Sequence, residues 1–355
     1  MPRELVAAAP RFAEFRTYSD DVELKPNQVR IRTLYGSPKH GTELNMYRGT
    51  NPFQEKKYDP EWQLFQRAAS IESPFPFGLG NMFVGEVIEV GSQVTAVQIS
   101  DRAAGYGSLR ETHILSEEDV LLMPEGMQWQ AALCWDPAQY AFQALRDSQL
   151  RLGDTAAVFG LGAIGLMTVA LAKLAGAQLV CGIDPIARRR EAAAELGADL
   201  VLDPKTIDTG MVIKRETGKR GADCVIETSG TAHALHQAVR AVTFGGRVTL
   251  VGWYSQGLAG VNFGEEAHFN IPDLIFSRVA SEPSREFPRW TRSRVKQVCW
   301  DLLSTGKINC EKIIDPVVDF AEADTAYAYY VDQHPEQSVK LGVVFPSPTA
   351  EVSHD

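Results

Sequence analysis

The sequence predicts an α/β protein with a doubly wound parallel sheet and a second, smaller β-rich domain. Strand-like and helix-like segments alternate from about residue 129 onward, which is typical of consecutive βαβ units. Before that point, short strands separated by glycine and proline predict a barrel-like domain. A glycine-rich turn inside the alternating region predicts a dinucleotide site at the end of one strand.

The first part of the chain is predicted to consist mainly of strands. Residues 28–34 alternate between apolar and polar side chains, as a half-buried strand does. Residues 83–90 have the same character, and residues 111–115 and 120–122 predict shorter strands. Together these segments favour a small barrel-like domain.

The alternating region begins after this part. Its predicted elements are strands 155–159, 178–183, 198–202, 224–227, 245–252 and 274–280, and helices 163–176, 187–197 and 232–242. A helix at 292–305 and a strand at 340–345 follow, which is too little for a third domain, so we expect them to return to the first. The predicted domains are residues 1–137 with 283–355, and residues 138–282.

The glycine-rich turn has the full spacing of a dinucleotide-binding unit. Gly160, Gly162 and Gly165 form G-x-G-x-x-G between a strand and a helix, and the helix begins with Ala163 and Ile164. The three glycines allow a tight turn, close approach of the backbone to a pyrophosphate, and close packing of helix on strand. The N-terminus of the helix then offers N–H groups to the phosphates. We therefore predict a Rossmann-type nucleotide domain with these residues in contact with the cofactor.

An acid at the end of the next strand predicts which nicotinamide cofactor is bound. Asp184 follows Gly165 by nineteen residues, where a carboxylate accepts hydrogen bonds from the ribose and repels a 2′-phosphate. This favours NAD(H) over NADP(H). Arg188, Arg189 and Arg190 could each pair with a phosphate, and Arg189 is a candidate cofactor contact.

A later strand end also predicts ligand contacts. Gly252 ends the strand at 245–252, and Trp253 and Tyr254 follow it. Strand ends line the ligand crevice of open α/β sheets. Gly252 and Trp253 are candidate cofactor contacts and Tyr254 a candidate substrate contact. The alternative is that they only pack within a loop.

Composition excludes several classes of partner. A net charge of −10 argues against nucleic acid and anionic membrane surfaces. No stretch reaches the roughly 20 apolar residues of a membrane span, and the first residues have no apolar signal core. Five cysteines occur without a C-x-x-C pair, which suggests reduced thiols in a cytoplasmic protein.

Further motifs occur along nearly the whole chain. They are Gly41-Thr42-Glu43-Leu44, Tyr47-Arg48-Gly49, Gly85-Glu86-Val87, Val90-Gly91, Asp101-Arg102, Asp136-Pro137 and Gly245-Gly246. With the glycine turn, they resemble the medium-chain dehydrogenase/reductase superfamily, in its zinc alcohol and polyol dehydrogenase branch. The resemblance implies a GroES-like β-barrel catalytic domain interrupted by the nucleotide domain, an active site in the cleft between them, and a homodimer or homotetramer.

The sequence departs from this family at the zinc ligands. His40 stands where the zinc enzymes have a cysteine, and Asn81 where they have a histidine. Asp136 corresponds to their acidic ligand, and the lobe with four cysteines is missing. Because a catalytic zinc needs three good ligands, we expect no metal. The alternative is an unusual zinc site formed by His40, Asp136 and Cys134.

Without zinc, other groups must hold the reacting oxygen and move its proton. The resemblance places the Thr42 hydroxyl near the substrate oxygen. His40 is the candidate acid/base, Asp136 can orient it, and Asn81 can donate a hydrogen bond. The alternatives are a histidine that fills a vacated metal position, helix caps at Thr42 and Asp136, and an ordinary loop residue at Asn81.

Three further polar residues complete the candidate substrate site. They are Lys39, Asn45 and Tyr106. We expect a small-molecule substrate with several hydroxyl groups, such as a sugar, cyclitol, polyol or glycoside, whose secondary alcohol is interconverted with a ketone. The alternatives are a double-bond reductase of the quinone or enoyl type and a nucleotide-binding protein without enzymatic activity.

Overall fold

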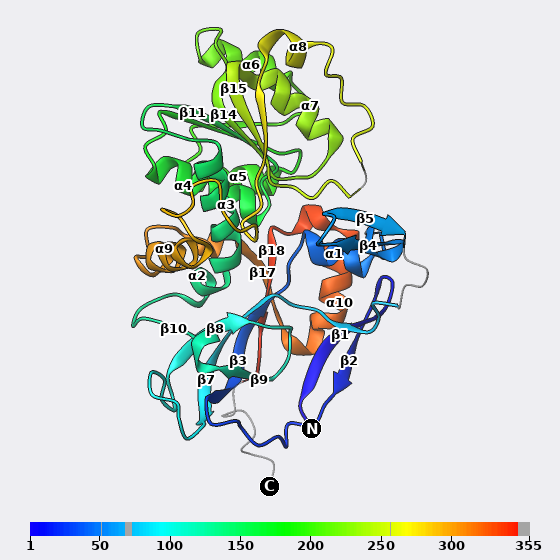
Figure 1. The fold of residues 1–355 in the computed structure, drawn as a ribbon, viewed down its shortest axis with the longest axis vertical. Coiled ribbons are helices and arrows are strands. Elements are labelled where there is room, and N and C mark those ends of the chain that lie inside the picture. Colours follow the sequence, from blue (N-terminus) through cyan, green and yellow to red (C-terminus); the bar gives the residue numbers. More distant parts are fainter. Residues whose placement is uncertain (51, 68–72, 256, 347–355) are drawn as a thin grey trace. The chain divides into compact units, whose positions relative to one another are not determined.

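The computed structural model describes residues 1–50, 52–67, 73–255 and 257–346. These form two compact units (Figure 1). Unit 1 comprises Met1–Glu125 with Pro316–Asp355, and unit 2 comprises Gly126–Asp315. Within the described ranges, no helix is both long and apolar enough to cross a membrane.

Unit 2 contains a parallel sheet with its strands in the order β13-β12-β11-β14-β15-β16. The strands are β11 (Thr155–Phe159), β12 (Leu179–Ile183), β13 (Leu200–Leu202), β14 (Ala222–Glu227), β15 (Val242–Leu250) and β16 (Asp273–Phe276). Every residue of β11 is buried, as expected for a strand covered on both faces. The strand order reverses between β11 and β14, so ligands are expected at the carboxyl ends of these two strands.

Helices form a layer on each side of this sheet (Figure 1). The helices of unit 2 are α2 (Trp129–Leu133), α3 (Trp135–Asp147), α4 (Ala163–Leu174), α5 (Ala187–Glu195), α6 (Thr209–Glu216), α7 (Ala232–Ala241), α8 (Glu266–Asn270) and α9 (Arg292–Ser304), and α2 and α9 lie outside the two layers. In one layer α4 contacts both α3 and α5, and in the other α7 contacts both α6 and α8. The core between sheet and helices contains buried Phe159, Ile183 and Leu235.

Unit 1 is built from antiparallel strands. They are β1 (Arg3–Ala9), β2 (Phe12–Thr17), β3 (Gln28–Ser37), β4 (Lys56–Asp59), β5 (Leu64–Arg67), β6 (Phe77–Gly78), β7 (Met82–Val90), β8 (Arg102–Tyr106), β9 (Thr112–Ser116), β10 (Leu121–Leu122), β17 (Ile314–Asp319) and β18 (Lys340–Val344). The main sheet has the order β10-β8-β7-β3-β18-β17, with β9 also paired to β3. Two short helices, α1 (Thr42–Tyr47) and α10 (Ala323–Ala326), accompany it. Residues from both ends of the chain therefore share one sheet.

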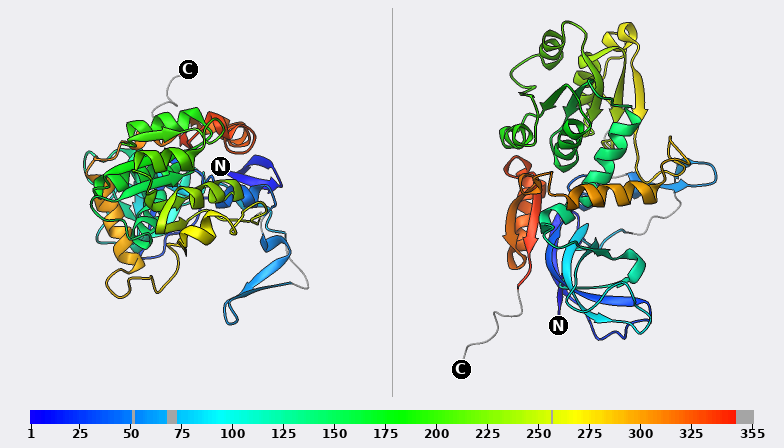
Figure 2. Two further views of the ribbon diagram at one scale, coloured as in Figure 1. Left: turned by 90° about the horizontal axis from the view of Figure 1, so that it is seen from above. Right: turned by 90° about the vertical axis from the view of Figure 1, so that its left-hand side faces the viewer.

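One hairpin of unit 1 was not predicted from the sequence. Strands β4 and β5 pair only with each other, and they project from the rest of the unit (Figure 2). The aromatic side chains of Tyr58, Trp62 and Phe65 are exposed there. Because these strands bury little apolar surface, the usual signals of a half-buried strand are weak.

The two units begin and end at other residues than the predicted domains. We expected boundaries at 137/138 and 282/283, whereas the compact units meet at 125/126 and 315/316. The reason is packing, since α9 contacts α2 and α3, and the indole N–H of Trp135 donates to the carbonyl of Lys296 at 2.9 Å. These helices flank the parallel sheet in sequence and pack with its unit.

Candidate active site

The glycine turn after β11 has the geometry that its sequence predicts. Gly160 has φ +85°, in the left-handed region that glycine tolerates. A Cβ on Gly165 would lie 1.8 Å from the carbonyl oxygen of Gly160, so helix and turn approach too closely for a side chain. A Cβ on Gly162 would meet no described atom within 4 Å. Protein packing therefore demands glycine at 160 and 165, while the space at 162 is open to a ligand.

The first turn of α4 faces this open space with its own backbone groups. Gly162 is the N-cap, and no side chain caps the helix. The N–H groups of the first turn, which includes Ala163 and Ile164, thus have no side-chain acceptor there. Such a helix N-terminus binds phosphate through N–H groups and its positive dipole end.

Asp184 is tied directly to the glycine turn. Its side chain is buried, with Oδ2 accepting from the Leu161 N–H at 2.7 Å and Oδ1 from the Ile186 N–H at 2.8 Å. A carboxylate offers about four acceptor positions, so two remain for ribose hydroxyls. Arg189 Nη1 lies 3.9 Å from Oδ2, and Arg190 donates to the Asp184 carbonyl at 2.7 Å.

The turns after β14 and β15 lie against each other. A Cβ on Gly252 would be 2.2 Å from the N atom of Gly230, and one on Gly230 would be 3.1 Å from the Trp253 carbonyl oxygen. The hydroxyl of Tyr254 donates to Glu227, a buried acid at the end of β14 that the sequence analysis missed. Tyr254 was predicted to contact substrate, and its hydroxyl forms a hydrogen bond to another residue of unit 2.

The candidate residues of unit 1 gather at one end of its main sheet. Lys39 and His40 follow β3, Asn81 precedes β7, and Tyr106 ends β8. Met82 pairs with both Ser37 and Tyr106, and this register places the three strand ends side by side. Two main-chain hydrogen bonds extend this strand pairing beyond the strand ends. The Asn81 N–H donates to the Ser37 carbonyl at 3.0 Å, and the Gly107 N–H donates to the Asn81 carbonyl at 3.0 Å.

His40 is held by a residue 301 positions away. Its Nε2 atom accepts a hydrogen bond from the Leu341 N–H at 3.0 Å. A backbone N–H can only donate, so this contact assigns the tautomer in which Nδ1 carries the proton. In this state His40 is a neutral donor through Nδ1, and taking up a proton at Nε2 would break the bond to Leu341.

Thr42 and Asn45 lie on the short helix α1. Thr42 is its exposed first residue, and Gly41 rather than Thr42 occupies the N-cap position. Asn45 is partly buried, and its carbonyl accepts from the Thr50 N–H at 3.0 Å. Thr42 is therefore not the N-cap of α1, which was the alternative to its predicted substrate contact.

Glu43 connects the loops that carry His40 and Asn81. It is buried, with Oε2 accepting from the Gly80 N–H at 2.8 Å and Oε1 from the Tyr327 hydroxyl at 2.9 Å. Burial raises the pKa of Glu43, while the hydrogen bonds from Gly80 and Tyr327 act in the opposite direction. Gly80 has φ +134°, and a Cβ there would lie 2.4 Å from the Leu109 N atom. Glu43 thereby stabilises a backbone conformation just before Asn81 that only glycine adopts readily.

The side chain of Asn81 has an unused donor. Its Nδ2 atom is buried and has no hydrogen-bond partner among the residues that the structure describes. A buried amide donor without a partner costs roughly 1–3 kcal/mol. A substrate or cofactor oxygen at this position would satisfy it.

Asp136 and Cys134 belong to unit 2, whereas His40 and Asn81 belong to unit 1. Asp136 is buried in the first turn of α3, and Cys134 is buried just before it. The thiol of Cys134 hydrogen-bonds that of Cys310, which raises the pKa of Cys310 together with burial.

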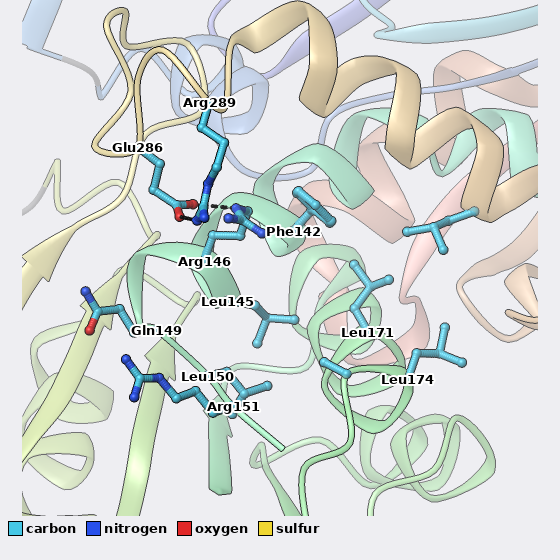
Figure 3. A pocket seen from close by; sticks show the side chains of 12 residues that line it. Phe142, Leu145, Arg146, Gln149, Leu150, Arg151, Leu171, Leu174, Glu286 and Arg289 are labelled. Atoms are coloured by element: carbon cyan, nitrogen blue, oxygen red, sulfur yellow. Dashed lines mark hydrogen bonds and ion pairs between the residues drawn. The ribbon is translucent and has the colours of Figure 1, made fainter. Parts of the chain in front are cut away.

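A surface cavity of about 580 Å³ occurs elsewhere in unit 2 (Figure 3). It is lined by Leu171 and Leu174 at the C-terminal end of α4, by Leu145, and by the ion pairs of Glu286 with Arg146 and Arg289. The glycine turn lies at the opposite end of α4, so this cavity is distinct from the nucleotide site.

Comparison with known proteins agrees with this geometry. The fold is that of a nucleotide-dependent oxidoreductase, and residues 163–303 match the family model described as zinc-binding dehydrogenase. The D-guloside 3-dehydrogenase of Escherichia coli is 47% identical, over 97% of this chain and 100% of the relative. The chain therefore belongs to the medium-chain dehydrogenase/reductase superfamily.

More distant relatives show the same fold. The (R,R)-butanediol dehydrogenase of Bacillus subtilis is 31% identical, over 51% of this chain and 60% of the relative. The crystal structure of 2R,3R-butanediol dehydrogenase from the same species superposes with a TM-score of 0.76 at 21% identity, covering 98% and 100% of the two chains. The predicted fold class, a Rossmann domain with a GroES-like domain, is confirmed. The chain is an oxidoreductase of the alcohol and polyol dehydrogenase type that uses a nicotinamide cofactor.

The family name implies zinc, but the described residues do not fit the family's metal. In unit 1, His40 Nε2 is bonded to Leu341, and Asn81 presents an amide where a second strong ligand is needed. Within the described ranges, no group of three His, Cys, Asp or Glu side chains is arranged to hold a metal ion.

Proposed function

We propose that this enzyme oxidises a secondary hydroxyl of a glycoside to a ketone with NAD⁺, and that it does so without zinc. The reaction transfers hydride from the carbinol carbon to the nicotinamide, and the hydroxyl proton leaves to solvent or to a side chain. The substrate class is supported by the 47% identical D-guloside 3-dehydrogenase and by the polar residues around His40. The single structural observation that carries the choice of NAD is the buried carboxylate of Asp184 beside the glycine turn.

Preference for NAD follows from charge at the ribose position. The free acceptor positions of Asp184 suit the two ribose hydroxyls, and its charge repels a 2′-phosphate. Arg189 faces this carboxylate at 3.9 Å, so part of its charge is already balanced by Asp184.

In place of a Lewis acid, we infer hydrogen-bond donors around the reacting oxygen. The Thr42 hydroxyl, the Nδ1–H of His40 and the amide of Asn81 are the candidate donors. Donors positioned before reaction stabilise developing alkoxide charge without reorganisation. The Nδ1 atom of His40 already carries a proton, so the hydroxyl proton leaves to solvent rather than directly to this atom. The imidazole can take up a proton only at Nε2, which breaks the hydrogen bond from Leu341, so proton uptake and loop geometry are coupled. For Asp136, the orienting role expected from the sequence stays a prediction.

The test is a turnover assay that varies substrate and cofactor together. Methyl D-hexosides, free sorbitol and 2,3-butanediol are each offered with NAD⁺ or NADP⁺, and formation of reduced cofactor is followed by absorbance. We expect the highest kcat/KM with a hexoside and NAD⁺. Turnover of butanediol alone would overturn the glycoside assignment, and a preference for NADP⁺ would overturn the role of Asp184.

The other functions considered from the sequence have less support. A non-catalytic nucleotide sensor is set aside, because the chain is an oxidoreductase. A double-bond reductase is not proposed, because the relatives named above are dehydrogenases of hydroxyl compounds.

A further inference from the structure

Glu227 is a buried acid at the place where a doubly wound sheet binds its ligand. It ends β14, which is next to β11 at the reversal of strand order, and its side chain is fully buried. The turn that follows it faces the glycine turn across this point. Charged side chains are seldom fully buried without a structural or functional reason.

The carboxylate of Glu227 collects donors from two separate turns. From the turn after β14 it accepts the Ser229 N–H at 2.7 Å, the Gly230 N–H at 3.1 Å and the Ser229 hydroxyl. From the turn after β15 it accepts the Tyr254 hydroxyl. Its own carbonyl accepts the N–H groups of Val251 at 2.8 Å and Gly252 at 3.2 Å.

The turn after β14 is in contact with the glycine turn, and the turn after β15 packs against the turn after β14. A Cβ on Gly160 would lie 2.8 Å from the Ser229 N atom, and the Thr228 hydroxyl donates to the Gly160 carbonyl at 2.7 Å. Gly252 lies so close to Gly230 that it tolerates no side chain, and Gly230 has φ +69°, in the region that favours glycine. A shift of the turn after β14 would therefore reach the glycine turn directly, and a shift of the turn after β15 would reach it through Gly230.

We propose that Glu227 is a positioning residue for the nicotinamide cofactor, which holds the turns 228–230 and 252–254 as one wall beside the glycine turn. The carboxylate acts through the backbone of Ser229 and Gly230 and through the hydroxyl of Tyr254. It takes no part in hydride or proton transfer. The assignment deepens the proposed function, because it rests on the cofactor which that function uses.

The physical basis is the cost of leaving donors unpaired. Glutamine at 227 has the same shape, but it replaces one acceptor oxygen by an NH₂ group that must face N–H or O–H donors. A buried donor that loses its acceptor costs roughly 1–3 kcal/mol, and the turn relaxes to avoid this cost. Relaxation moves backbone that borders the cofactor.

A matched control exists at the amino end of the same strand, β14, whereas Glu227 lies at its carboxyl end. Thr217 is buried before β14, where its hydroxyl donates to the Ile213 carbonyl at 2.7 Å and accepts the Gly221 N–H at 2.8 Å. Thr217→Val breaks a buried hydrogen-bond cluster of unit 2 without approaching the carboxyl ends of the strands. It reports what loss of stability alone does to cofactor binding.

The experiment measures binding of NADH and NADPH by fluorescence titration, without substrate, for the parent, Glu227→Gln, Tyr254→Phe and Thr217→Val. Thermal melting without cofactor is recorded in parallel. For the cofactor that the parent binds more tightly, we expect Kd to rise about tenfold in Glu227→Gln and by a smaller factor in Tyr254→Phe. Thr217→Val lowers the melting temperature and leaves Kd unchanged. In turnover, the KM for cofactor rises more than kcat falls.

A Kd within twofold of the parent in both Glu227→Gln and Tyr254→Phe would overturn the proposal, whatever their melting temperatures. If Glu227→Gln does not fold, Tyr254→Phe decides alone, because loss of one hydroxyl at a partly buried ring is a mild change. Since no substrate is present, failure of the glycoside assignment leaves this result untouched.

Discussion

The glycine turn of unit 2 and the loops around His40 in unit 1 are built in different ways. The turn is local, because Gly160, Gly165 and Asp184 lie within one strand–helix–strand unit. Gly165 packs on Gly160, and Asp184 accepts a hydrogen bond from the turn at Leu161. The loops of unit 1 are assembled over long separations, by Glu43 with Tyr327 and by His40 with Leu341. The predicted cofactor contacts thus come from a short backbone pattern, while the predicted catalytic and substrate residues depend on partners far away in the chain.

The largest effect is expected at the glycines of the turn. Here the requirement for close packing can be separated from the requirement for space beside a bound cofactor. Gly165→Ala places a Cβ 1.8 Å from the Gly160 carbonyl, and should lower the melting temperature and abolish measurable NADH binding. Gly162→Ala meets no described atom within 4 Å, and should keep the melting temperature while NADH affinity falls at least about tenfold. Calorimetry with NADH titration checks both. If the two variants changed melting temperature and NADH affinity in the same way, Gly165 could not be assigned to packing and Gly162 to ligand binding.

The second effect tests unit 1 at its candidate acid/base. His40→Ala should lower kcat by about 10²–10⁴-fold, the usual range for a positioned proton donor or acceptor. Cofactor affinity should stay near that of the parent, because the nucleotide turn lies in the other unit. His334→Ala, at a half-exposed histidine paired with Glu336, is the control. Unchanged kcat in His40→Ala would leave His40 as a structural residue only.

The third effect concerns the choice of nicotinamide. Asp184→Ala should relax the preference for NAD⁺ over NADP⁺ in kcat/KM by about tenfold or more, because the charge that repels a 2′-phosphate is lost. Asp203, after the neighbouring strand β13, pairs with Arg190 at 3.2 Å and serves as the control through Asp203→Asn. A preference that stays the same in Asp184→Ala would contradict its assignment.

The smallest effect is a pH dependence of stability in unit 1. His113 is buried and stacked on Phe83 with ring centres 3.7 Å apart, and burial, with a smaller effect of Arg110, lowers its pKa from 6.5 to about 3. Because the unfolded histidine binds a proton more readily, its contribution to stability is complete above 6.5. That contribution is lost as pH falls from 6.5 towards 3, by at most about 1.4 kcal/mol per pH unit.

Denaturant melts across this range check the dependence on pH. His113→Phe, which keeps an aromatic ring against Phe83, should have a smaller slope of unfolding free energy against pH. The same slope in parent and variant would show that other groups cause the acid sensitivity.

Much of unit 2 could be predicted because its signals are local. The strand at 155–159, the glycine spacing and Asp184 lie within thirty residues, and the predicted elements agree closely with β11, α4 and β12. Glu227 was predicted only as the last residue of a strand, since nothing in the sequence shows that Tyr254 lies beside it.

Less of unit 1 could be predicted, because its decisive contacts join residues far apart in the chain. Glu43 was visible in a family motif, but an acid in the first turn of a helix is usually exposed, so its burial had no local signal. Lys340 is likewise buried, and it donates to the Pro38 carbonyl across 302 positions. The structure places Lys39, His40 and Asn81 next to strand ends, while their roles in catalysis and substrate binding stay predictions.

The most direct test of the account is the metal content of the purified enzyme, with activity measured before and after a chelator. The account predicts essentially no bound zinc and an unchanged rate of NAD⁺ reduction after chelation. One tightly held zinc per chain, with activity lost on its removal and restored by its return, would contradict hydride transfer supported by His40, Thr42 and Asn81 alone.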